Sequence, residues 1–68
     1  MQNRLKFLRE SRQWSQPKMS LKSGVPQTTI SAVERGIIVP SVQTATKLAE
    51  ALDCAIEDLF PKRENTNP

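Results

Sequence analysis

The 68-residue chain has little of the chemistry that catalytic and metal sites require. It contains no histidine and a single cysteine, Cys54, so one subunit can form neither a disulfide framework nor a Cys/His metal site. The sequence also lacks a paired acid and base at a plausible site and a glycine loop that could cradle phosphates. We therefore expect that the protein is not an enzyme and that it has no cofactor and no catalytic or metal-binding residue.

Long apolar runs are missing as well. No stretch approaches the roughly eighteen apolar residues of a membrane helix, and the first residues lead into an amphipathic segment, unlike those of a signal peptide. With one cysteine, these features predict a cytoplasmic protein with no membrane contact and no evident small-molecule ligand. The length predicts a single small domain over residues 1–60, followed by a polar, loose tail over residues 61–68.

The charge that is present is divided unevenly along the chain. Residues 1–40 carry seven Lys and Arg against two Glu, a net charge of +5, whereas residues 41–68 carry three basic and five acidic residues, a net charge of −2. A basic half is the electrostatic footprint of a nucleic-acid surface, because neutralising phosphates releases counterions. For any single lysine, a solvated helix face remains the simpler explanation.

Two short helices joined by a tight turn are predicted within the basic half. Gly24 ends a helix over residues 16–23, because glycine adopts the left-handed conformation at a helix end without steric cost. Pro26 then starts a helix at Gln27, although it lacks the side-chain acceptor of a Ser or Thr cap, which is worth about 1 kcal/mol. Helices separated by so few residues cross steeply, which predicts a helix-turn-helix.

The remaining pattern is also helical. An apolar stripe predicts a first helix over residues 3–13, Ser41 caps a fourth helix that reaches Leu52, and a fifth helix spans residues 56–60. We expect Trp14 to pack on Met19 beside an N-cap at Ser15, and Cys54 to act as a small buried apolar residue. The predicted core consists of Leu5, Leu8, Met19, Ser20, Val25, Ile30, Val33, Leu48, Ala49, Leu52, Ile56, Leu59 and Phe60.

Specific positions along this pattern resemble the Cro and phage-repressor type of helix-turn-helix regulator, the Xre-like family. The resemblance covers residues 3–60 and is carried by Gln16, Met19-Ser20, Gly24-Val25, Thr29-Ile30-Ser31, Glu34-Arg35-Gly36 and Pro40-Ser41. It implies an all-α, compact five-helix bundle of the lambda-repressor-like type, in which the second and third helices form the motif. It also implies that Arg9 and Glu34 form a structural ion pair, since an unpaired glutamate would repel DNA phosphates.

The third helix is expected to read bases in the major groove. Its residues that point away from Ile30 and Val33 are Gln27, Thr28, Ser31 and Ala32. Glutamine can pair with adenine, and a threonine or alanine methyl can contact thymine, so we expect a preference for A·T positions. For Thr28 and Ser31, plain helix surface is a serious alternative.

Phosphate contacts are expected around both helices of the motif. The resemblance implies this role for Gln16, whose side chain and neighbouring backbone N–H groups open the second helix. Further candidates for phosphate contacts are Lys18, Lys22, Thr29 and Arg35.

The segment after the third helix carries three successive apolar residues, Ile37 to Val39, where relatives often have Lys or Arg. Such a segment can cover the core, contact DNA sugars or form part of a protein interface, and of these we expect it to cover the core and to join an interface. The resemblance implies a symmetric dimer on a palindromic operator, with recognition helices about 34 Å apart. Its expected contacts are Ile37, Ile38, Ala55, Ile56, Leu59 and Phe60, although Leu59 and Phe60 can equally close the monomer core.

The function that these features predict is sequence-specific binding of double-stranded DNA by a transcriptional regulator. We expect a repressor or autoregulator that acts by occupying its operator. The alternative is an antitoxin-like or adaptor module that keeps the fold and binds a protein through the apolar segment.

Overall fold

The computed structural model describes residues 3–61, and these form an all-helical domain, as predicted. Its helices are α1 (Leu5–Ser11), α2 (Gln16–Ser23), α3 (Gln27–Glu34), α4 (Val42–Ala51) and α5 (Ile56–Leu59). The expected loose tail lies outside the described residues from residue 62 onward.

Serine caps fix the starts of two helices. The Ser15 hydroxyl accepts a hydrogen bond from the Lys18 N–H, and the Ser41 hydroxyl accepts one from the Thr44 N–H, each at 3.2 Å. Both caps match the sequence prediction, because a serine oxygen satisfies an N–H group that the first helical turn leaves unpaired.

The first helix is shorter than the predicted range of residues 3–13. The Asn3 side-chain oxygen accepts from the Leu5 N–H at 3.0 Å, so the chain turns before α1 begins. At the other end, Gln13 adopts a left-handed conformation with φ of 60°, which a continuing helix excludes.

The turn between α2 and α3 has the predicted geometry. Gly24 has φ of 77° and donates its N–H to the Ser20 carbonyl at 2.8 Å. The Ser20 hydroxyl donates to the Val25 carbonyl at 2.7 Å, and the Ser23 hydroxyl accepts from the Val25 N–H at 3.1 Å. Two serines therefore tie the turn to the end of α2, which fixes the angle at which α3 leaves.

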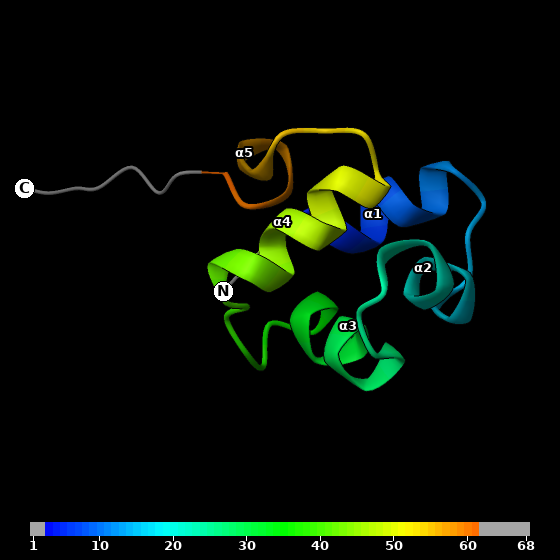
Figure 1. Ribbon diagram of the computed structural model, residues 1–68, viewed down its shortest axis with the longest axis horizontal. Helices are drawn as coiled ribbons and strands as arrows, with labels where there is room; N and C mark the ends of the chain where they lie inside the picture. Colours follow the sequence, from blue (N-terminus) through cyan, green and yellow to red (C-terminus); the bar gives the residue numbers. More distant parts are fainter. Residues whose placement is uncertain (1–2, 62–68) are drawn as a thin grey trace, which may run out of the picture.

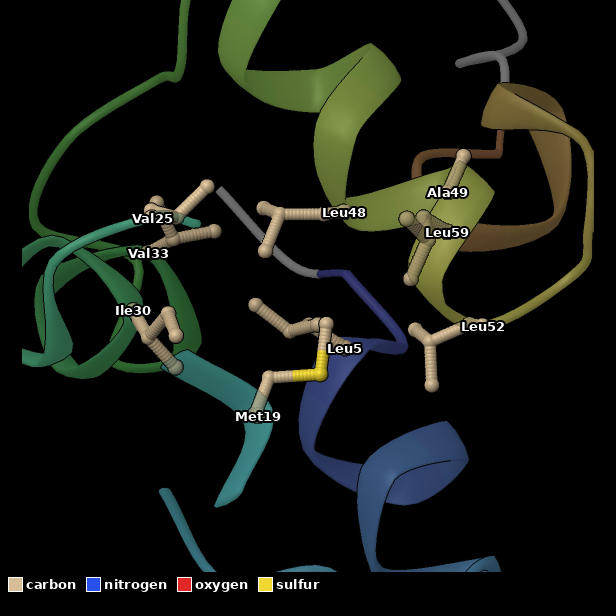
Figure 2. Packing of buried hydrophobic residues seen from close by; sticks show 9 residues of the cluster. All are labelled: Leu5, Met19, Val25, Ile30, Val33, Leu48, Ala49, Leu52 and Leu59. Carbon is tan, nitrogen blue, oxygen red and sulfur yellow. The ribbon is translucent and has the colours of Figure 1, made fainter. Parts of the chain in front are cut away.

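A single apolar core draws on every helix. Figure 2 shows side chains from α1 to α5 pointing toward one another. Of the predicted core residues, Leu8, Ser20, Ile56 and Phe60 are half-buried. The three apolar ones pack against this cluster, as do Trp14 and Cys54. The fully enclosed cluster consists of Leu5, Met19, Val25, Ile30, Val33, Leu48, Ala49, Leu52 and Leu59.

The core places α3 at one edge of the domain. In Figure 1, α4 crosses the centre, with α5 on one side of it and α3 on the other. Because α3 packs on α2 and α1 through Ile30 and Val33, its opposite face is free of the core. Among residues 3–61, no helix has the length and apolar character needed to span a bilayer.

Candidate nucleic-acid interface

The exposed face of α3 begins at its first turn. Gln27 and Thr28 are exposed, whereas Thr29, Ser31 and Ala32 are half-buried. The face is therefore most accessible at the N-terminal end of the helix, which is the end that reads bases when a helix-turn-helix docks in a major groove. Ser31 and Ala32 lie further along and offer less of their surface.

No side chain caps the start of α3, because Pro26 occupies the N-cap position with φ of −56° and ψ of 143°. Its carbonyl accepts from the Ile30 N–H at 3.0 Å, so the helix forms without a side-chain acceptor. Within residues 3–61, the N–H groups of this first turn thus receive no side-chain cap and remain available to an outside acceptor.

The start of α2 offers fewer backbone donors than the sequence suggests. Pro17 has no N–H, the Lys18 N–H is bound to the Ser15 hydroxyl, and the Met19 N–H is bound to the Ser15 carbonyl. In the part of the chain that the structure describes, the Gln16 N–H is the one donor of this first turn without a partner. At this end of α2, the backbone N–H and the side chain of Gln16 are therefore the groups best placed to bind a phosphate.

Exposed cations accompany this surface. Lys18 and Lys22 on α2 and Arg35 at the end of α3 are all exposed, and within residues 3–61 none of the three forms an ion pair that a phosphate would first have to break. The Lys22 ammonium also lies 5.8 Å from the centre of the Trp14 ring, where a cation–π interaction orients it.

Arg9 and Glu34 form an ion pair that links α1 to the end of α3. Arg9 Nε donates to Glu34 Oε2 at 2.6 Å and Arg9 Nη2 donates to Glu34 Oε1 at 3.1 Å, a two-pronged geometry. The side chains are only 8% and 3% exposed, respectively. The hydrogen bond to Glu34 raises the pKa of Arg9 further above its already high value, so the guanidinium stays charged.

The same pair reaches α2 at two points. Arg9 Nη1 donates to the Trp14 carbonyl at 2.6 Å, just before the Ser15 cap. Gln16 Nε2 donates to Glu34 Oε1 at 3.0 Å. Sequence reasoning missed the Gln16 contact, because the two residues are far apart along the chain and amide–carboxylate pairs leave no pattern of spacing.

The apolar segment after α3 does not cover the core, contrary to expectation. Ile37 and Val39 are 61% and 71% exposed, and Ile38 is also exposed. The Ile37 N–H is bound to the Ala32 carbonyl at 2.9 Å, which directs the segment away from the interior.

An apolar groove lies beside this segment. It is lined by residues of the α3–α4 loop, α4 and α5, and Val42 on its edge is 78% exposed, a feature that sequence periodicity did not single out. Leu59 is fully buried in the monomer core, so the expected interface loses that residue, while Ala55 is exposed. The residues that line the groove are Val39, Pro40, Val42, Ala45, Ile56 and Phe60.

Two short, mutually packed helices joined by a tight turn at Gly24, the first carrying exposed lysines and the second an exposed polar first turn, are the arrangement of a helix-turn-helix DNA-binding domain. The comparisons with known proteins agree. A family model described as helix-turn-helix matches residues 5–59. The chain belongs to the helix-turn-helix family, of the Cro and C1 type.

Several relatives are similar over most of this chain. An uncharacterized HTH-type transcriptional regulator of Bacillus subtilis, YgzD, is 38% identical over 60 residues, which cover 88% of this chain and 91% of that protein. A regulator of the same description in Methanocaldococcus jannaschii has the same identity and coverage. Another, y4dL of Sinorhizobium fredii, is 39% identical over 59 residues, which cover 87% of this chain and 30% of that longer protein.

Proposed function

We propose that the protein is a sequence-specific transcriptional regulator, a repressor or autoregulator that acts in the cytoplasm by occupying a duplex DNA operator. The observation that carries the proposal is the accessible first turn of α3, where Gln27 and Thr28 are exposed. The helix packs against α2, which carries the exposed Lys18 and Lys22. Family membership and relatives named as transcriptional regulators support it.

In this proposal, Gln27 and Thr28 make the principal base contacts, with Ser31 and Ala32 contributing deeper along α3. A glutamine amide can donate to and accept from adenine at once, while threonine and alanine methyl groups contact thymine. The face holds no arginine for guanine, so A·T positions dominate the operator. Gln16, Lys18, Lys22, Thr29 and Arg35 hold the phosphates and set the register of the helix.

Two copies of the chain bind together in this proposal, because one α3 contacts too few bases to be selective in a genome. The exposed Ile37 and Ile38, with Ala55, Ile56 and Phe60 around the apolar groove, supply the contact between copies. A symmetric pair places the two helices in successive major grooves and requires a palindromic operator.

Salt dependence of duplex binding tests this proposal against the protein-adaptor alternative, which the exposed apolar groove favours. If Lys18, Lys22 and Arg35 of two subunits neutralise phosphates, the logarithm of the association constant should fall linearly with the logarithm of the salt concentration, with a slope of about −5. Lys18→Ala should reduce that slope by about 2 for the pair of subunits, whereas Lys47→Ala on α4 should leave it unchanged. Absence of duplex binding at low salt would instead support an adaptor.

A further inference from the structure

The Glu34 carboxylate touches two functional groups at once. Its Oε1 atom accepts from Arg9 Nη2 at 3.1 Å and from Gln16 Nε2 at 3.0 Å. We propose that Glu34 is a positioning residue for DNA binding: it orients the Gln16 amide so that the second N–H of that amide faces a DNA phosphate. This inference rests on the proposed function, because it assumes that Gln16 contacts a phosphate.

The hydrogen bond between Gln16 and Glu34 decides which end of the amide is held inward. A glutamine amide has an oxygen that only accepts and a nitrogen that carries two N–H donors. An ionised carboxylate only accepts, so it can hold the nitrogen and must repel the oxygen. With one N–H bound to Glu34, the same nitrogen keeps a second N–H for another acceptor.

Orientation matters because a phosphate also only accepts hydrogen bonds. A free Gln16 side chain would present its oxygen to the phosphate in part of its conformations and would have to reorganise on binding. The half-buried Gln16 side chain is already fixed at one end, next to its own backbone N–H, which has no hydrogen-bond partner among residues 3–61. The two donors can therefore converge on one phosphate.

The charge of Glu34 does not oppose this arrangement. Its side chain is only 3% exposed and both carboxylate oxygens face the Arg9 guanidinium, at 2.6 and 3.1 Å. Arg9 thus neutralises the carboxylate beside the phosphate site. Glu34, on α3 and held by Arg9 of α1, in turn holds the Gln16 side chain in place at the start of α2. Immobilising one flexible side chain in advance should improve affinity by about three- to tenfold.

The test removes the Glu34 acceptor without leaving a buried charge. Replacing the pair by Arg9→Met with Glu34→Leu substitutes apolar side chains of similar volume, a change that buried ion pairs often tolerate. Binding to a short duplex of mixed sequence at low salt is measured for the wild-type protein, the paired replacement, Gln16→Ala, and the combination of all three changes. Gln43→Ala, at an exposed glutamine of α4, is the matched control.

A positioning role requires that the effect of the paired replacement on DNA binding depends on whether Gln16 is present. The paired replacement should weaken binding about three- to tenfold when Gln16 is present and should have no effect when residue 16 is alanine. An equal loss in both backgrounds would assign Glu34 a purely structural role and overturn the inference, although DNA binding itself stands. No effect of Gln16→Ala would also overturn it, and no duplex binding by the wild-type protein would refute the proposed function itself.

A measurement on the wild-type protein keeps the inference testable if the replaced pair fails to fold. The side-chain amide of Gln16 should show restricted motion on the nanosecond timescale by ¹⁵N relaxation in the free protein, whereas that of exposed Gln43 should be mobile. Equal mobility of the two amides would overturn the inference.

Discussion

Removing one member of the Arg9–Glu34 pair should destabilise the domain far more than removing both. Glu34→Ala deletes a carboxylate that binds Arg9 at two points and leaves a guanidinium only 8% exposed, with the exposed Glu10 carboxylate at 3.9 Å as its remaining counter-charge. Breaking a buried ion pair in this way costs about 3–5 kcal/mol. A domain of this size has a total free energy of unfolding of about 3–10 kcal/mol, so a large share of its stability is lost.

Thermal unfolding followed by circular dichroism measures the effect. Glu34→Ala should lower Tm by more than about 12 °C, since 1 kcal/mol corresponds to about 4–8 °C in a domain of this length. Arg9→Met with Glu34→Leu should recover most of that loss, because no charge remains buried. Glu50→Ala, at an exposed glutamate of α4, is the control and should change stability by less than about 0.5 kcal/mol.

The reasoning is refuted if Glu34→Ala unfolds within a few degrees of the wild-type protein. It is also refuted if the paired replacement is as unstable as the single one, since the cost would then come from lost packing and lost hydrogen bonds, such as that from Arg9 to the Trp14 carbonyl, and not from an unpaired charge.

Three further perturbations test other parts of the structure. Gly24→Ala should cost about 1–2 kcal/mol, measured by urea unfolding, because φ is +77° although nothing lies within 4 Å of an added Cβ; no loss would exclude the left-handed turn. Val42→Lys should leave Tm nearly unchanged but reduce the complex with a palindromic duplex from two chains to one, measured by sedimentation, and two retained chains would contradict the proposed interface. Cys54 should react with iodoacetamide more slowly than free cysteine at neutral pH, because burial and, to a lesser extent, Asp58 raise its pKa and leave less thiolate; equal rates would contradict this.

The sequence predicted the elements whose signals are local. Gly24, Ser15 and Ser41 act within a few residues of their own positions, so their turn and caps could be located from residue types alone. The apolar period identified the helices and most of the core, but the first helix was predicted too long. Its end depends on Gln13, a residue with no special preference for the left-handed conformation that it adopts.

Contacts between distant segments were harder to predict. The Asn3 side chain donates to the Val33 carbonyl at 2.8 Å, and Gln16 binds Glu34, yet neither pair has a spacing that marks it. For the apolar residues after α3, the sequence led to a contact that the structure does not contain. Their composition suggested burial, whereas their exposure depends on how the loop leaves α3, a matter of three-dimensional geometry.

The central claim is that the first turn of α3 reads bases in duplex DNA. The most direct measurement is selection from a pool of random duplexes with the wild-type protein and with Gln27→Ala. The account predicts that the wild-type protein enriches a palindrome with half-sites about 10 base pairs apart, and that Gln27→Ala loses preference at one A·T position of each half-site, at a cost of about 1–3 kcal/mol. Identical preferences of the two proteins at every position, or no enriched sequence, would contradict it.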